Sequence, residues 1–186
     1  LQTVLDGTRT LDTVVLVGLP LLVHGKLYNC AAVLCRGQLL GLVPKTWLPN
    51  YAEFYERRYF TSGRRLEGCT VEIGAQTVPF GCDLLFCHRF MPELKVGVEL
   101  CEDLWAPDPP STALALAGAT VICNPSASDE LVTKDEYLRQ LVSSHAARLV
   151  CGYVYCNAGD GESTQDVVYT GQNLICENGV LLAESE

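Results

Sequence analysis

Short apolar segments recur along the whole chain, some joined by hairpin-like turns and others separated by segments with helical periodicity. Residues 13–19 are apolar and mostly β-branched, which is typical of a strand covered on both faces. Residues 133–149 instead carry apolar side chains at helical spacing. Because strands and helices alternate, with hairpins between some of them, the sequence predicts an α/β fold in which helices cover a mixed sheet.

Turn and cap residues give the boundaries of these elements. Gly18 and Pro20 are expected to end the first strand. Thr133 is expected to cap the helix at 133–149, with Glu136 three residues later, as in a capping box. A second helix is expected at 109–118, and a long ordered loop with a short helix at 44–68. The other expected strands are 27–35, 39–43, 70–73, 83–86, 95–100, 120–123, 151–156, 167–170, 174–176 and 180–182.

The composition argues against several classes of function. A net charge of -9 over 186 residues disfavours a nucleic-acid partner, because binding to phosphates depends on clustered Lys and Arg. No apolar run approaches the roughly 20 residues needed to cross a bilayer, and the N-terminal residues lack the order of a signal peptide. We therefore expect a soluble, single-domain chain with no membrane partner.

The ten cysteines lie mostly inside apolar runs, where a free thiol behaves as a small hydrophobic side chain. Such use of cysteine fits a reducing cytoplasm better than a secreted disulfide framework. Only three histidines occur, and no two cysteines are separated by two residues. We therefore expect no metal site.

One cysteine has a different setting. The segment 96–105 runs as an apolar strand into Cys101, which is followed by two acidic residues and then by a helical stretch. A nucleophile on a sharp strand-to-helix turn is exposed, with backbone N–H groups nearby to hold an oxyanion. Cys101 is therefore a candidate nucleophile, and another buried thiol is the alternative interpretation.

Two other segments could assist such a nucleophile. Lys45 directly follows a strand, and a lysine near a thiol lowers the pKa of that thiol and balances the charge of a tetrahedral intermediate. The segment 124–128 follows a buried strand, where α/β sheets usually hold ligands. A solvent-facing lysine and an ordinary turn are the alternatives. An imidazole base is not expected, because His24, His88 and His145 are better explained as turn or packed histidines.

Six segments together resemble the nitrilase superfamily of carbon-nitrogen hydrolases in their order and spacing: 18–20, 25–29, 45–51, 99–105, 124–126 and 168–171. Within it, Leu-Pro-Asn-Tyr after Lys45 and Glu-Asp-Leu-Trp after Cys101 are similar to the glutaminase domain of glutamine-dependent NAD synthetases. The resemblance covers nearly the whole chain. We therefore expect residues 1–186 to be one partial nitrilase-type domain.

The resemblance implies an αββα sandwich, incomplete at its N-terminus, and a catalytic set of Cys, Lys and Glu. Cys101 matches the nucleophile and Lys45 matches the lysine. In the family the general-base glutamate precedes these motifs, and no Glu occurs before Glu53, so the base is expected to lie outside this chain. Family positions near the glutamine substrate are matched by Tyr51, Phe54, Glu102, Ser128 and Lys134.

The implied reaction is hydrolysis of the glutamine side-chain amide, with Cys101 attacking the amide while Lys45 and a backbone N–H near Glu102 hold the oxyanion. The ammonia would support NAD synthesis from nicotinic acid adenine dinucleotide in a synthetase domain outside this chain. ATP and magnesium are expected in that domain, and no cofactor in this one. The superfamily also implies a homo-oligomer. The alternatives are a free-standing amidase or carbamoylase acting on another small amide, and a catalytically inert fragment that lacks the base.

Overall fold

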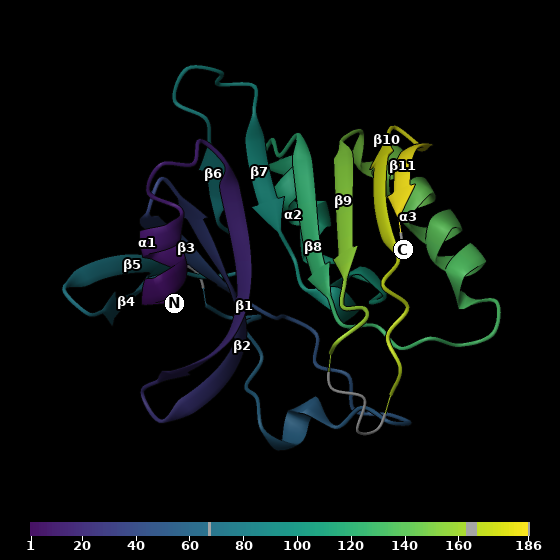
Figure 1. Cartoon of the computed structure of the whole chain (residues 1–186), viewed down its shortest axis with the longest axis horizontal. Coiled ribbons are helices and arrows are strands. Elements are labelled where there is room, and N and C mark those ends of the chain that lie inside the picture. Colours follow the sequence, from purple (N-terminus) through teal and green to yellow (C-terminus); the bar gives the residue numbers. More distant parts are fainter. Residues whose placement is uncertain (67, 163–166, 186) are drawn as a thin grey trace.

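Two mixed β-sheets pack face to face in the computed structural model, which describes residues 1–66, 68–162 and 167–185 (Figure 1). The first sheet has the strand order β1-β2-β3-β5-β4, with antiparallel pairs except between β3 and β5. Its strands are β1 (Val14–Val23), β2 (Lys26–Cys35), β3 (Gln38–Pro44), β4 (Cys69–Ile73) and β5 (Gln76–Phe80).

The second sheet has the order β11-β10-β9-β8-β7-β6. Its strands are β6 (Leu85–Cys87), β7 (Lys95–Val98), β8 (Val121–Ser126), β9 (Gly152–Asn157), β10 (Asn173–Glu177) and β11 (Val180–Ser185). The three central strands β7, β8 and β9 are parallel, whereas the outer pairs are antiparallel. The carboxyl ends of the parallel strands therefore meet at one edge of the sheet, where α/β proteins usually bind ligands.

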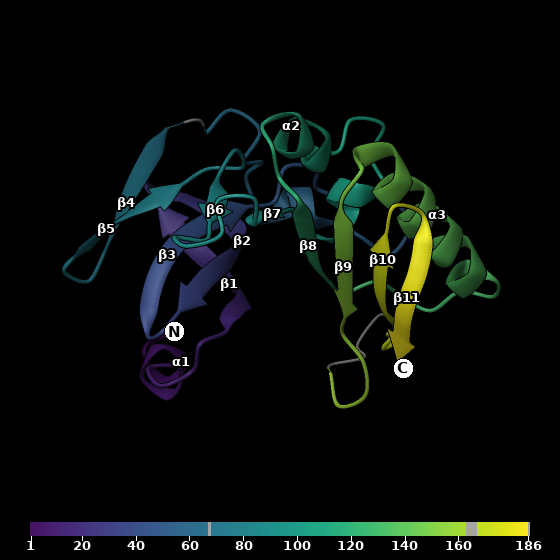
Figure 2. The same cartoon turned by 90° about the horizontal axis from the view of Figure 1, so that it is seen from above.

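Helices cover the outer face of the second sheet, and a short N-terminal helix lies beside the first sheet (Figure 2). The helices are α1 (Gln2–Gly7), η1 (Glu56–Arg58), η2 (Cys101–Leu104), α2 (Pro110–Leu116) and α3 (Lys134–Leu149). Between α2, α3 and the second sheet lies a core that includes the fully buried Ile122, Val142 and Leu174. A separate core joins the two sheets, with Val33 and Val98 among its buried residues. The α/β class and the nitrilase-like pair of stacked sheets are confirmed.

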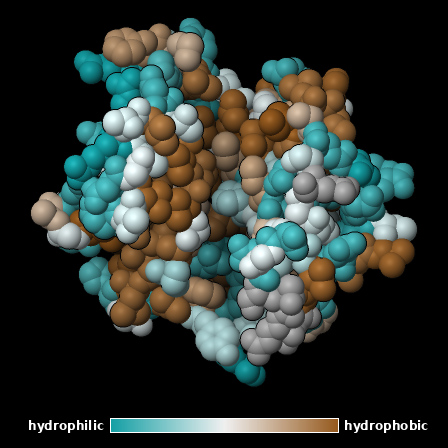
Figure 3. Space-filling view, in the orientation of Figure 1, coloured by the Kyte–Doolittle hydropathy of each residue, from teal (hydrophilic) through white to brown (hydrophobic). Residues whose placement is uncertain are grey.

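The prediction that Gly18 and Pro20 end the first strand is wrong. β1 continues to Val23, and Pro20 pairs with Asn29 of β2. Because β1 is the edge strand of its sheet, a proline there need not donate an N–H to a further strand. Apolar residues gather along β1 on the surface (Figure 3), and Leu22 is 69% exposed.

Two other expectations need correction, and one strand was missed. Residues 167–170 form no strand, since they contribute only an isolated bridge between Tyr169 and Asp129. Thr133 precedes α3 in a left-handed conformation and makes no side-chain capping hydrogen bond, so the expected capping box is absent. β5 was not predicted, because its sequence includes Pro79 and lacks a clear apolar alternation.

The remaining boundaries agree with the sequence within a few residues, including the short helix η1 inside the long loop after β3. All ten cysteines are free thiols. Among the residues that the structure describes, none of the helices combines the length and apolarity that crossing a lipid bilayer requires.

Candidate active site

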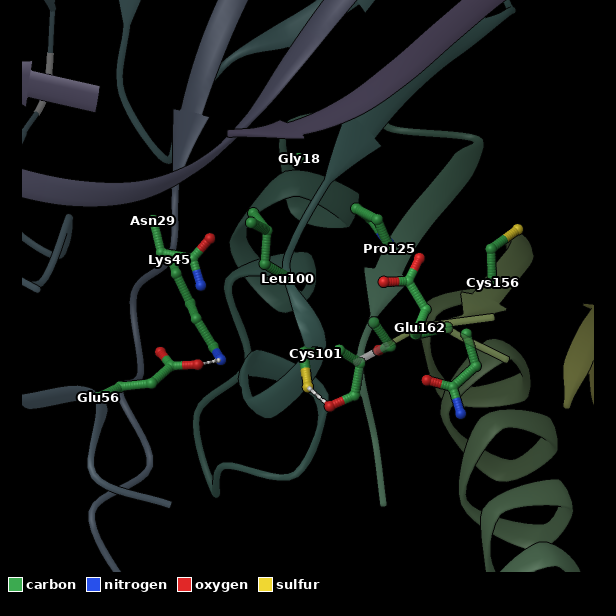
Figure 4. Close-up of a pocket in the computed structure, with 13 residues that line it drawn as sticks. Gly18, Asn29, Lys45, Glu56, Leu100, Cys101, Pro125, Cys156 and Glu162 are labelled. Atoms are coloured by element: carbon green, nitrogen blue, oxygen red, sulfur yellow. Dashed lines mark hydrogen bonds and ion pairs between the residues drawn. The ribbon is translucent and has the colours of Figure 1, made fainter. Parts of the chain in front are cut away.

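Three chain segments converge at the ends of strands. Lys45 directly follows β3, Cys101 follows β7 after two residues, and β8 ends at Ser126. Figure 4 shows the side chain of Cys101 between Lys45, which comes from the first sheet, and Pro125 of the second sheet. The site therefore lies where the two sheets meet, at the carboxyl ends of β7 and β8.

Cys101 occupies a strained turn. Its φ of 46° lies in the left-handed region, which is costly for a residue with a side chain unless the surroundings hold it there. The backbone N–H of Cys101 donates to Oδ1 of Asn124 at 2.8 Å, and its Sγ lies 3.9 Å from the carbonyl oxygen of Ala127. The N–H of Cys101 is therefore already engaged by a side chain.

Lys45 is a buried cation, with only 2% of its surface exposed. Its Nζ donates to Oε1 of Glu56 at 2.8 Å. Burial alone would lower the pKa of Lys45, but the charges of Cys101 and Glu56 outweigh it and raise that pKa above its usual value. Lys45 therefore remains an ammonium group at neutral pH, beside the candidate nucleophile.

Two adjoining cavities share Lys45, Glu56 and Cys101 in their walls. The larger, of about 410 Å³, extends toward Asn29, Cys156 and other residues of the two sheets. The smaller, of about 220 Å³, contains every residue that the resemblance assigned to chemistry or substrate: Lys45, Tyr51, Phe54, Cys101, Glu102, Ser128 and Lys134. The structure thus brings all seven together, and their individual roles stay predictions.

One wall of the smaller cavity is formed by Tyr51, Phe54 and Glu102. The Tyr51 hydroxyl lies 3.0 Å and 2.9 Å from the two carboxylate oxygens of Glu102, and its ring meets that of Phe54 edge to face. Burial raises the pKa of Glu102, and the Tyr51 hydroxyl opposes that shift by donating to the carboxylate. This wall therefore presents a carboxyl group that a phenol holds in place.

Another part of the lining of the smaller cavity carries charges of both signs. Lys134 forms an ion pair with the buried Asp129, and its Nζ lies 5.3 Å from the centre of the Trp105 ring. Ser128 is buried beside them, with its backbone N–H donating to Oδ1 of Asn157 at 2.7 Å. Carboxylates and an ammonium group in one small cavity suit a zwitterionic ligand, such as a free amino acid.

Asp103 joins the chain segment of Lys45 to that of Cys101. Its buried carboxylate accepts the backbone N–H groups of Thr46 at 3.1 Å and Trp47 at 2.6 Å, both next to Lys45, and that of Leu100 at 2.9 Å. Burial raises the pKa of Asp103 to about 7, although the N–H donors oppose the shift. The segment of Lys45 and that of Cys101 are therefore held against each other by one side chain.

We expect Asp103→Asn to destabilise the protein by about 3 kcal/mol at pH 8, because the amide nitrogen would face N–H donors and leave buried groups without partners. Urea unfolding followed by circular dichroism measures this. Asp108→Asn is the matched control, since the Asp108 side chain is 73% exposed and its ion pair with Arg64 is long at 3.5 Å. We expect the control to change stability by less than about 0.5 kcal/mol. Equal effects of the two substitutions would contradict the bridging role.

Sequence reasoning missed Glu56, Asp103 and Asn124 as individual contributors. Asp103 stands three residues after Leu100 and its carboxylate accepts the Leu100 N–H, but the sequence lacks the Ser or Thr that marks a capping box, so no local signal identified it. Asn124 belongs to a recognised motif, but its bond to Cys101 joins two strands and has no local signature. Glu56 lies in a long loop without periodicity, so only the fold places it against Lys45.

Comparison with known proteins places this site in a family. The model of the carbon-nitrogen hydrolase family matches residues 1–184. The chain is 49% identical to the glutamine-dependent NAD(+) synthetase of Mycobacterium tuberculosis over 173 residues, which are 93% of this chain and 25% of that protein. It is 46% identical to the enzyme of the same name from Mycobacterium leprae, over all of this chain and 28% of that protein. The chain thus spans about a quarter of the length of these curated relatives.

Solved structures agree. A glutamine-dependent NAD(+) synthetase from Cytophaga hutchinsonii superposes with a TM-score of 0.81 at 32% identity, over 93% of this chain and 27% of that chain. Nit3 from Saccharomyces cerevisiae, a member of the nitrilase superfamily, superposes with a TM-score of 0.76 at 18% identity, over 99% of this chain and 59% of that chain. The second likeness supports the fold alone.

Proposed function

The chain belongs to the carbon-nitrogen hydrolase family, and from this premise we propose that it hydrolyses the side-chain amide of glutamine. The observation that carries the proposal is the smaller cavity, in which Cys101 and Lys45 share walls with groups of both charges. Glutamine has an α-ammonium and an α-carboxylate group. In our proposal, Glu102 with Tyr51 holds the ammonium group, and Lys134 holds the carboxylate.

In the proposed reaction, Sγ of Cys101 attacks the amide carbon, and the thiol proton passes to the general-base glutamate that the family resemblance places before residue 1. Lys45 and the N–H of Glu102 stabilise the oxyanion. The carbon–nitrogen bond then breaks as its nitrogen takes a proton and leaves as ammonia. Water attacks the remaining thioester, which releases glutamate and restores the thiol.

Within this scheme Glu56 orients Lys45. One oxygen of the Glu56 carboxylate accepts from Nζ of Lys45, so the ammonium group is fixed before the substrate arrives. The other oxygen is buried and has no hydrogen-bond partner among the described residues, while Glu56 as a whole lines both cavities. A pre-oriented cation stabilises the transition state more than a mobile one does, because it need not reorganise as charge develops on the substrate.

We further propose that the chain is the glutaminase part of a longer glutamine-dependent NAD synthetase. The support is the identity with the mycobacterial enzymes of that name, together with the quarter of their length that the chain spans. The ammonia would then pass to a synthetase domain, which would use ATP and magnesium. The whole protein would act as an amidotransferase.

Substrate preference tests the proposal. Ammonia release by the full-length protein would be measured with glutamine, asparagine, propionamide and an N-carbamoyl amino acid. We expect kcat/KM for glutamine to exceed that for propionamide by about 100-fold or more, because a site with buried charged groups discriminates against a ligand that leaves them unpaired. Comparable or faster release from propionamide or the carbamoyl compound would instead assign the site to a free-standing amidase or carbamoylase.

A further inference from the structure

We propose that Glu99 is a positioning residue for the nucleophile, which acts on Cys101 through Tyr153 and Asn124. The inference rests on the proposed role of Cys101. Glu99 lies two residues before Cys101, but its side chain points away from the cavities, since it is fully buried and lines neither of them. Its influence must therefore pass through the interior of the second sheet.

A continuous chain of hydrogen bonds provides that path. The N–H of Cys101 donates to Oδ1 of Asn124 at 2.8 Å, and Nδ2 of Asn124 donates to the Tyr153 hydroxyl at 3.0 Å. The Tyr153 hydroxyl in turn donates to Oε1 of Glu99 at 2.5 Å. All three side chains have 0% exposure, so water does not compete for these bonds.

Glu99 fixes the direction of the bonds at its end of this chain, as the backbone N–H of Cys101 does at the other end. The other oxygen of Glu99, Oε2, accepts the N–H of Ser111 at 2.9 Å, in the first turn of α2 where N–H groups lack partners within the helix. Both partners of the carboxylate are thus donors, and only a group with two acceptors satisfies them. The Tyr153 hydroxyl must therefore donate to Glu99, which leaves its oxygen to accept from the NH₂ of Asn124. Glu99 thereby reinforces the amide orientation in which the Asn124 oxygen accepts from the Cys101 N–H and, at 2.8 Å, from the Ser126 hydroxyl.

This orientation matters because the Cys101 turn is strained. A φ of 46° persists only where the surroundings determine the backbone, and the bond from the N–H of Cys101 to Asn124 is one of those determinants. If Asn124 rotated its amide, an NH₂ group would face the Cys101 N–H and the bond would become a repulsion. The turn would then relax and displace Sγ from the substrate.

The buried carboxylate of Glu99 has no cation among its described hydrogen-bond partners. Beyond Ser111 lies His145, whose Nε2 is 2.8 Å from the Ser111 hydroxyl, and burial lowers the pKa of His145 to about 4. His145 is therefore neutral at pH 7. Burial raises the pKa of Glu99, while its hydrogen bonds from Tyr153 and Ser111 oppose the shift. An apolar side chain at position 99 would avoid the cost of desolvating a carboxylate. A role in positioning Cys101 explains why a carboxylate is present despite that cost.

The test uses Glu99→Gln and Tyr153→Phe, each checked for folding by circular dichroism. Glu99→Gln places an NH₂ group against one of the two donors that the carboxylate accepts from, and Tyr153→Phe removes the hydroxyl that links Glu99 to Asn124. We expect each variant to slow the alkylation of Cys101 by iodoacetamide, which is measured by mass spectrometry of the peptide that contains Cys101. We also expect each variant to lower kcat for amide hydrolysis about 100-fold, with KM changed less than about three-fold.

Two comparisons distinguish a loss of Cys101 positioning from a general destabilisation of the protein. The double variant should lose no more than either single variant, because both break the same chain of bonds. Glu72→Gln is the matched control, since Glu72 is exposed on β4 and accepts a hydrogen bond from Thr77 at 2.7 Å. Folded variants that alkylate and turn over at the wild-type rate would overturn the inference. Alkylation involves no glutamine, so this result is independent of whether glutamine is the substrate.

Discussion

Replacing Cys101 by alanine is expected to abolish amide hydrolysis, with a loss of about 10⁴-fold or more in kcat. The physical reason is that no other described thiol shares a cavity wall with both Lys45 and Glu102. Without Sγ the thioester cannot form, and Lys45 has no covalent intermediate to stabilise. Release of glutamate and ammonia from glutamine by the full-length protein is the measurement, with thermal unfolding recorded in parallel to show that the fold persists.

Cys123→Ala is the matched control. Cys123 lies on β8 in the same sheet and lines neither cavity, and burial raises the pKa of its thiol to about 11, which makes it a poor nucleophile at neutral pH. We expect this variant to retain wild-type turnover. Substantial hydrolysis by Cys101→Ala, or an equal loss of turnover in Cys123→Ala, would contradict the assignment of Cys101 as the nucleophile. Capture of a thioester on the wild-type protein, absent from the alanine variant, would give the same answer by a second route.

The parts of the site that the sequence reveals are those in short local motifs. Cys101 stands out because an apolar strand runs directly into an acidic turn, and Lys45 because it ends a strand before a long loop. The residue that pairs with Lys45 is eleven positions away, in a loop without periodicity, and the partner of the Cys101 N–H comes from another strand. Such contacts depend on how strands pair, which spacing alone does not specify.

The fold shows the same division between local and long-range information. The hairpin of β2 and β3 follows from two apolar runs around Arg36 and Gly37, both of which adopt the positive φ that the turn requires. β1 passes through Gly18 and Pro20 because it lies at the edge of its sheet, a position that its own sequence does not disclose. The parallel ladder between β5 and β3 has a single register pair, Leu42 and Phe80, so the N–H that Pro79 lacks is not needed on that side.

Lys45→Met is expected to lower kcat by about 10³-fold, because the substitution keeps most of the length of the side chain and removes the cation that we propose faces the developing oxyanion. It should also destabilise the protein by about 2–3 kcal/mol, since the carboxylate of Glu56 loses its partner while its side chain is only 22% exposed. Steady-state kinetics with glutamine and urea unfolding measure the two effects separately. Lys26→Met is the control, because Lys26 is exposed on β2 and lines neither cavity.

A second substitution distinguishes the chemical role of Lys45 from its structural role. In Lys45→Met combined with Glu56→Gln, the unpaired carboxylate is gone, so we expect most of the lost stability to return. The activity should stay low, because no cation remains beside Cys101. If the double variant regained activity together with stability, Lys45 would act only by neutralising Glu56, and the oxyanion would have to be held by backbone N–H groups such as that of Glu102.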